Sequence, residues 1–317
     1  MRINFVMSNE VYSGIFDAII NYFREYLPQD CELYVTKYPL DNMDIYHYHR
    51  PNLEKNLREN SVVTIHHDLE DTDPWFQANE FIDKYHQADK IICLNSLQKK
   101  YLLEKEELNN TVIIPHGIDK RIFSPRVLQK VEDRKYNFAI VSKRYGRRVK
   151  GEALMHELYK RLDTSKICFH FLGTDRTIDQ EEVENLGFEA YSYEYLPYNM
   201  YDKFYENIDF LLIPSLYEGG PANLPEAIYQ RIPILGRKIA MIEDYLIEGT
   251  NGFFLTGIPH IDSELIERII NDKDNLYSKM IEKINTYELK VLDWEIIVKE
   301  HVTLYKTIVN SKDSNND

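Results

Sequence analysis

Short apolar runs that are typical of buried strands alternate along this chain with stretches of helical periodicity. After the first run, Ile15, Ile19, Phe23 and Tyr26 recur at the spacing of one helix face. Strands alternating with helices are typical of a parallel sheet covered on both faces, which predicts an α/β fold. The predicted strands are 2–7, 32–36, 44–48, 61–66, 90–94, 111–114, 137–141, 167–172 and 210–213. The predicted helices that follow the first are 75–87, 96–107, 151–162, 198–207, 222–230 and 239–248.

A charged stretch with a proline, around residues 124–135, separates two such halves. We therefore expect one Rossmann-like domain at 1–128 and a second at 129–292, with 311–317 forming a disordered polar tail. Ligands of such sheets bind beyond the carboxyl ends of the strands, so the loops that follow the strands are the places to look for chemistry.

Composition narrows the class of protein. The 317 residues carry a net charge of −14, which argues against a nucleic-acid partner. Three widely spaced cysteines, Cys31, Cys93 and Cys168, predict reduced core residues. No apolar run approaches the roughly 18 residues of a membrane span, and a signal peptide is not recognisable. We expect a cytoplasmic protein with at most peripheral membrane contact.

The most informative segment is IPSLYEGGPANLPEAIYQRIPIL at 213–235. It reads as a strand end, a turn with Gly219 and Gly220, and a helix start near Pro221. Glycines let backbone N–H groups approach an anion, and a helix N-terminus favours negative charge. Glu218 and Glu226 bracket this turn, and a carboxylate suits the vicinal hydroxyls of a sugar or ribose. The ligand-binding residues predicted at the helix start are Pro221, Ala222, Asn223 and Leu224.

A second segment, VSKRYGRRVKGEALMHEL at 141–158, holds the densest basic cluster of this acidic chain. A diphosphate needs such cations to neutralise its charge, although a solvated basic loop is the plainer alternative. Neither a Walker phosphate loop nor a complete G-x-G-x-x-G is present.

Histidines follow two of the predicted strands. His66 and His67 close the strand at 61–66, and His47 and His49 share one face of the strand at 44–48. They can contact a substrate or serve as capping and core residues. A metal site is not predicted, because the chain has no H-E-x-x-H and no helical pair of histidines.

These segments together resemble glycosyltransferase family 4, whose members are retaining enzymes of the GT-B fold, with two Rossmann-like domains facing each other across a cleft. The segment at 213–235 carries the family's paired glutamates, and 242–255 resembles the stretch after it. The segments 88–102 and 113–125 resemble the end of the family's first domain. Residues 293–309 resemble its last helix, which implies that 293–310 packs back on the N-terminal domain.

The resemblance implies roles for individual residues. Glu226 would bind the donor ribose, while Glu218 with the backbone of Gly219 and Gly220 would hold the donor sugar. Lys150, with Arg144 or Lys143, would bind the diphosphate, and the choice between those two stays open. His66 matches the family's T-x-H and would lie near the transferred sugar, so Glu218, His66 and Lys150 are the predicted catalytic residues. Ser13 and Gly14 would approach the acceptor or a phosphate.

The sequence thus predicts a metal-independent retaining transferase of hexosyl type, without a cofactor, that takes a sugar from a UDP or GDP donor. The acceptor would be a carbohydrate, glycolipid or protein, in surface polysaccharide or glycoconjugate biosynthesis. One alternative is a nucleotide-sugar epimerase or phosphorylase-like enzyme of the same fold. Another is a non-catalytic protein that binds sugar nucleotides without turnover.

Overall fold

The computed structural model describes residues 1–7 and 14–313, which form two compact units. The first unit comprises Met1–Gly117, Glu218–Ala222 and the C-terminal segment from Leu292. The second comprises Ile118–Tyr217 and Asn223–Val291. Residues Glu218–Ala222, which interrupt the second unit in the sequence, therefore belong to the first unit, and they include Gly219 and Gly220 of the glycine turn.

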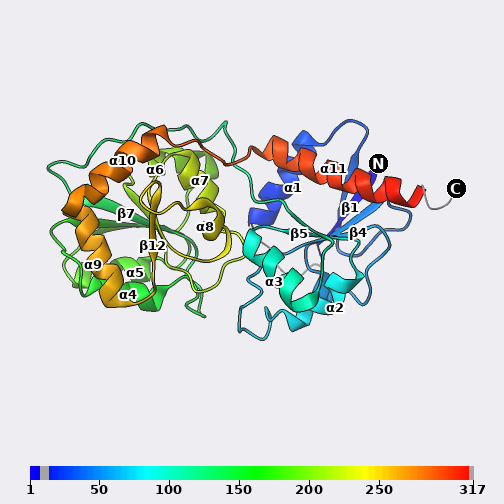
Figure 1. Cartoon of the computed structure of the whole chain (residues 1–317), viewed down its shortest axis with the longest axis horizontal. Helices are drawn as coiled ribbons and strands as arrows, with labels where there is room; N and C mark the ends of the chain where they lie inside the picture. The colour runs from blue at the N-terminus through cyan, green and yellow to red at the C-terminus, as the bar shows by residue number, and fades with distance from the viewer. Residues whose placement is uncertain (8–13, 314–317) are drawn as a thin grey trace. The chain divides into compact units, whose positions relative to one another are not determined.

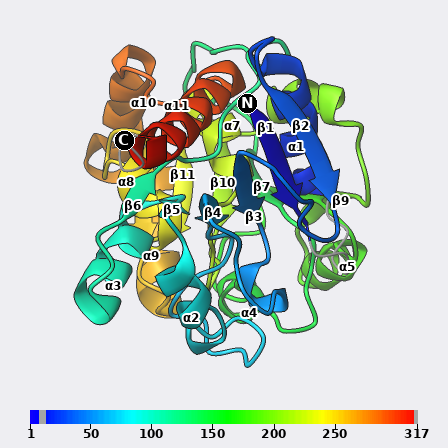
Figure 2. The same ribbon diagram turned by 90° about the vertical axis from the view of Figure 1, so that its right-hand side faces the viewer.

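The first unit is a parallel sheet of six strands, counted over the described residues, in the order β2-β1-β3-β4-β5-β6. Figure 2 shows these strands following one another from β6 to β1. Its strands are β1 (Arg2–Val6), β2 (Glu32–Thr36), β3 (Ile45–Tyr48), β4 (Ser61–Thr64), β5 (Lys90–Cys93) and β6 (Thr111–Ile113). Its helices are α1 (Gly14–Tyr26), α2 (Asn79–Gln87), α3 (Ser96–Glu106) and α11 (Trp294–Asp313), with a 3₁₀ turn at Pro51–Leu53.

Alternate strand residues bury opposite faces of this first sheet. Ile3, Phe5 and Val62 pack with α1 and α11, which lie against each other (Figure 1). Val63 and Ile91 face the other way and pack with α2 and α3. The final helix therefore belongs to the core of the first unit, and it continues to Asp313, beyond the expected end at 310.

The second unit has a parallel sheet of six described strands in the order β12-β11-β10-β7-β8-β9. Its strands are β7 (Tyr136–Val141), β8 (Ile167–Leu172), β9 (Glu189–Tyr193), β10 (Phe210–Ile213), β11 (Ile234–Arg237) and β12 (Gly252–Leu255). Its helices are α4 (Glu152–Tyr159), α5 (Thr177–Asn185), α6 (Tyr201–Tyr205), α7 (Asn223–Tyr229), α8 (Ala240–Tyr245), α9 (Pro259–Ile270) and α10 (Leu276–Thr286), with 3₁₀ turns at Tyr198–Met200 and Lys273–Asn275.

The core of the second unit lies between this sheet and four helices. Phe138 and Phe169 of the sheet pack with apolar residues of α4, α5, α9 and α10. In Figure 1, α7 and α8 lie on the other side of the strands. Every strand predicted from the sequence is present, whereas β9, β11, β12, α5, α9 and α10 were not predicted.

The two sheets reverse their strand order at different places. In the first sheet the reversal lies between β1 and β3, and in the second it lies between β7 and β10. Crevices at such reversals, beyond the carboxyl ends of the strands, are the usual ligand sites of doubly wound sheets. Each unit therefore has one place where a ligand is expected.

Candidate functional site

The reversal of the second sheet brings together the two motifs that the sequence singled out. The basic loop follows β7 after Val141, and the glycine turn follows β10 after Ile213. Because β7 and β10 are parallel neighbours, both loops leave the same edge of the sheet.

Three local contacts fasten these loops to each other. The Leu216 N–H donates to the Val149 carbonyl at 2.8 Å, and the Asn223 side-chain amide donates to the Val141 carbonyl at 2.8 Å. Gly151 has a φ of +86°, and a Cβ there would lie 2.3 Å from the Pro214 carbonyl oxygen. Only glycine fits such a backbone approach, so Gly151 closes the basic loop against the end of β10.

Three cations of the basic loop fall into two groups. The Nζ atoms of Lys143 and Lys150 lie 5.7 and 5.6 Å from the centroid of the exposed Tyr145 ring. Arg144 is turned to Asp179 instead, with Nε 3.2 Å from the carboxylate. Lys143 and Lys150 therefore share one neighbourhood, and Arg144 is held in a separate ion pair.

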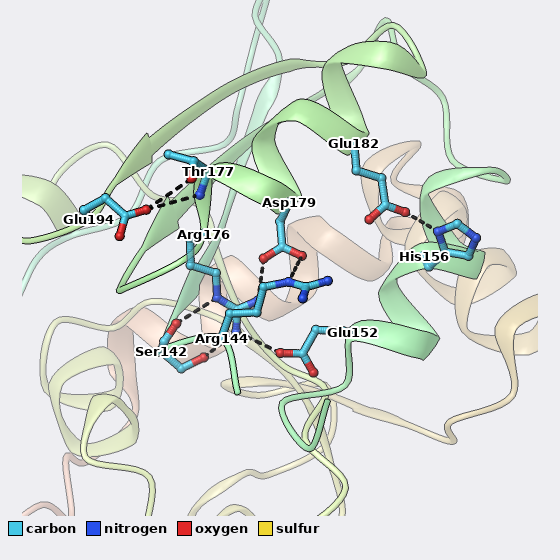
Figure 3. A network of polar contacts seen from close by, with 9 residues as sticks. All are labelled: Ser142, Arg144, Glu152, His156, Arg176, Thr177, Asp179, Glu182 and Glu194. Carbon is cyan, nitrogen blue, oxygen red and sulfur yellow. Dashed lines mark hydrogen bonds and ion pairs between the residues drawn. The ribbon is translucent and has the colours of Figure 1, made fainter. Parts of the chain in front are cut away.

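That ion pair is part of a buried network, shown in Figure 3. Arg176 is 1% exposed and donates to Asp179 at 2.8 Å and to the Ser142 carbonyl and hydroxyl, each at 2.8 Å. Glu152 lies 3.6 Å from the same guanidinium. The network ties the start of the basic loop to α5. Sequence reasoning missed Arg176 and Asp179, although both follow the predicted strand at 167–172, where polar loop residues merit inspection.

Glu226 lies in the first turn of α7 and is only 4% exposed. Its carboxylate accepts a hydrogen bond from the Tyr205 hydroxyl at 2.9 Å. Burial raises the pKa of Glu226 to about 7, although hydrogen bonds from Tyr205 and Tyr198 oppose the shift. The neighbouring Leu224 side chain is completely buried, so this residue can meet a ligand only through its backbone.

The rest of the glycine turn, Glu218–Ala222, packs within the first unit. The Asn95 side-chain amide donates to the Gly219 carbonyl at 2.7 Å. A Cβ on Gly219 would lie 2.3 Å from the His66 carbonyl oxygen, so a side chain has no room there. The Glu218 N–H meets the Asp68 carboxylate at 3.4 Å. The structure therefore brings Gly219 to the backbone of His66. Gly220 and Ala222 are half-buried and Pro221 is buried.

Five of the ten histidines form a connected cluster at the carboxyl edge of the first sheet. His49 Nδ1 lies 3.0 Å from His66 Nε2, and His47 bridges Tyr305 and Thr64 at 2.7 Å on each side. The other members of the cluster are His116 and His301.

Burial keeps these imidazoles neutral. It lowers the pKa of His49 to about 3 and the pKa values of His116 and His301 to about 4 each. His49, His66, His116 and His301 all line a cavity of about 20 Å³, and the Nε2 atoms of His49 and His116 have no hydrogen-bond partner there. A cavity of this size has room for about one water molecule.

The remaining predicted residues, Ser13 and Gly14, come after β1 in the sequence. Ser13 lies outside the described residues, and Gly14 begins α1 with nothing within 4 Å of the position of a Cβ. In the described ranges 1–7 and 14–313, histidine, cysteine and acidic side chains form no group of three that could hold a metal ion. No helix of these same residues combines the length and the apolar character needed to cross a membrane.

Comparisons with known proteins identify the fold. The chain resembles sucrose-phosphate synthase from Thermosynechococcus elongatus, with a TM-score of 0.74, 12% identity and coverage of 98% of this chain and 99% of that one. Anabaena HepE, solved with UDP, gives a TM-score of 0.71 at 12% identity, over 97% of this chain and 100% of that one. A glycosyltransferase from Rickettsia africae gives 0.67 at 14% identity, over 97% and 98%.

These likenesses confirm the predicted α/β class and the GT-B fold. A search of curated proteins found no match. The family model described as "Glycosyl transferases group 1" matches residues 126–286, about half of the chain, including the basic loop and the glycine turn. The chain therefore belongs to the group 1 glycosyl transferases.

Proposed function

We propose that this glycosyltransferase is a retaining, metal-independent enzyme of glycosyltransferase family 4 that transfers a hexosyl group from a UDP- or GDP-sugar. Its acceptor would be a carbohydrate, glycolipid or protein, as in surface polysaccharide or glycoconjugate synthesis. The observation that carries the proposal is the junction of the basic loop and the glycine turn at the reversal of the second sheet.

In this proposal Lys143 and Lys150 hold the diphosphate. Both ammonium groups lie around Tyr145, whereas Arg144 is neutralised by Asp179. Helix α7 has only seven residues, so its dipole supplies less charge than the two lysines. The lysines would therefore provide most of the stabilisation of the departing nucleoside diphosphate. The similarity to HepE, which was solved with UDP and with UDP-glucose, supports a nucleotide-sugar donor.

Glu226 would accept hydrogen bonds from the hydroxyls of the donor ribose. A carboxylate offers about four lone-pair sites, so the hydrogen bonds from Tyr205 and Tyr198 leave acceptor capacity for a ribose. With a pKa of about 7, Glu226 would bind the ribose best as the ionised form, at or above neutral pH. Glu218 and the backbone of Gly219 and Gly220 would contact the donor sugar.

His66 would lie beside the transferred sugar, held on its inner side by His49. Because burial lowers its pKa well below the usual value, His66 would act as a neutral hydrogen-bonding group and not as a cation. Pro221, Ala222, Asn223 and the Leu224 backbone would line the donor site, and Ser13 and Gly14 would approach the acceptor. No cofactor is proposed.

A donor screen tests this proposal. The full chain is mixed with a panel of UDP- and GDP-sugars, and binding is followed by ligand-detected NMR. We expect at least one donor to bind and to be displaced by its own nucleoside diphosphate. Turnover with that donor in excess EDTA should continue, and NMR should show the same anomeric configuration in the donor and the product. Failure of every donor to bind would refute the proposal. Conversion of the donor to its epimer would instead identify an epimerase.

A further inference from the structure

Arg50 occupies the place in the first unit where a ligand is expected. It follows β3 by two residues, and β3 pairs with β1 at the reversal of the first sheet. The first turn of α1, which follows β1, contributes Phe16 to the same region. The position corresponds to that of the loop after β10 in the second unit, beside the reversal of the sheet, where the ligand crevice of a doubly wound sheet forms.

Among residues 1–7 and 14–313, the neighbours of the Arg50 guanidinium are rings and not carboxylates. Its guanidinium carbon lies 5.4 Å from the centroid of the Phe16 ring. The same ring contacts His66, with centroids 4.8 Å apart, and His49, with centroids 5.7 Å apart. Arg50 therefore shares its immediate neighbourhood with the histidine that is proposed to face the transferred sugar.

No carboxylate of the described residues balances the positive charge of Arg50. Its Nε atom is buried without a hydrogen-bond partner, and no carboxylate of the described residues lies within 4.0 Å of its guanidinium. Arg58, in the same unit, is exposed and lies 3.2 Å from Asp41. Partial burial of an unpaired cation is costly, whereas an exposed ion pair is nearly neutral in energy.

The titratable groups next to Arg50 do not supply the missing negative charge either. Burial lowers the pKa values of His49, His66 and His67, and the positive charge of Arg50 adds to the effect on each. Tyr85, the other titratable neighbour, has a pKa raised well above 10 by burial. All four groups are therefore neutral at physiological pH, and they offer N–H and O–H groups but no negative charge.

We infer that Arg50 binds an anionic group, a phosphate or a carboxylate, carried by the acceptor. The guanidinium fork matches both anions, and the bound anion would supply the missing counter-charge. This inference rests on the proposed function, and it narrows the acceptor to one that bears a negative charge close to the reacting hydroxyl. The diphosphate of the donor is the other possible source of the anion, and the experiment separates the two.

Inorganic phosphate and acetate serve as probes, titrated into the full chain and followed by ³¹P and ¹H line broadening, with and without saturating UDP or GDP. The proteins compared are the wild type, Arg50→Gln and Arg50→Lys, with Arg58→Gln as the matched control. We expect Arg50→Gln to weaken phosphate binding about tenfold or more, since a charge-assisted pair is lost. Arg50→Lys should retain part of the affinity, and Arg58→Gln should bind like the wild type.

Several outcomes would overturn the inference. The first is equal phosphate binding by Arg50→Gln and the wild type. The second is no binding of either probe at about 20 mM, a concentration at which even weak single-site contacts register. The third is displacement of phosphate by the nucleotide. Displacement would assign Arg50 to the diphosphate of the donor. Circular dichroism checks that each variant is folded. If Arg50→Gln does not fold, the comparison of Arg50→Lys with the wild type still tests the inference. Because nucleotide binding is measured on the same samples, loss of the donor site and loss of the anion site are distinguishable.

Discussion

The two units use the same architecture to build opposite chemical surroundings. At the reversal of the second sheet, the loop after β7 presents Lys143, Lys150 and the exposed ring of Tyr145. At the reversal of the first sheet, β3 and β4 end in buried neutral imidazoles with Arg50 beside them. Cations such as the two lysines suit the charge of a diphosphate, whereas neutral imidazoles offer hydrogen-bonding groups without charge.

The difference also sets opposite responses to pH. A histidine with a lowered pKa binds fewer protons in the folded than in the unfolded chain, so the first unit gains stability as the pH rises towards about 6.5. Glu226 has a raised pKa and binds more protons in the folded chain, so the second unit loses stability as the pH rises from about 4.5 to about 7.

The largest effect is expected from breaking the network beneath the basic loop. Arg176→Met should lower the stability of the second unit by about 3–5 kcal/mol, because Glu152 would remain buried without its cation and Asp179 would keep only Arg144. Hydrogen exchange measured by mass spectrometry should show faster exchange in α4 and α5. Lys160→Met, on the exposed surface of the same unit, is the control. Unchanged exchange in Arg176→Met would mean that the network is not structural.

Removal of one lysine from the basic loop tests the role proposed for the charges of the second unit. Lys150→Ala should reduce kcat by about 10²–10³-fold, the range seen when a group that stabilises a developing negative charge is deleted. Lys160→Ala removes the same charge from an exposed site directly after α4 and should leave the rate unchanged. A wild-type rate for Lys150→Ala would remove this lysine from the site.

The loss of stability of the second unit between about pH 4.5 and pH 7 should disappear in Glu226→Gln. The raised pKa of Glu226 corresponds to a loss of about 3 kcal/mol of stability between pH 4.5 and pH 7 or above. Hydrogen exchange of α7 across this range should follow that slope in the wild type and be flatter in the variant. Equal slopes in the two proteins would show that Glu226 titrates normally.

The smallest effect is expected in the first unit. His49→Phe leaves His66 without its partner and should cost about 1–2 kcal/mol at pH 7. The variant should also be less sensitive to acid than the wild type. Both tryptophans, Trp75 and Trp294, lie in the first unit, so tryptophan fluorescence follows its unfolding selectively. His86→Phe, on the exposed side of α2, is the control, and an identical acid response in His49→Phe and the wild type would contradict the account.

The sequence predicted the elements with strong apolar runs and missed those without them. Strands β7 and β8 are six-residue segments with one polar residue each, Asn137 and His170. In contrast, β9 alternates exposed tyrosines with other residues, and β11 and β12 are short and contain glycine. In α5 the buried residues are Asp179 and Val183, so no apolar periodicity marks that helix. Tertiary packing, and not local propensity, defines these elements.

The residues of the candidate site likewise divide into those that the sequence predicted and those that it missed. The basic loop and the glycine turn were recognisable because glycine and charge are informative within a short segment. The proposed choice of Lys143 over Arg144 depends on Asp179, which is 35 residues away from Arg144 in the chain, and so no local pattern could suggest it. The unbalanced charge of Arg50 was equally invisible, since the sequence does not show which carboxylates lie nearby.

The central claim is that the second unit binds the donor diphosphate at Lys143 and Lys150 and the donor ribose at Glu226. A crystal structure of the full chain with UDP or GDP tests it most directly. The account predicts phosphate oxygens within hydrogen-bond distance of both lysine Nζ atoms and ribose hydroxyls on Glu226. A nucleotide bound elsewhere, with both lysines in solvent, would contradict it.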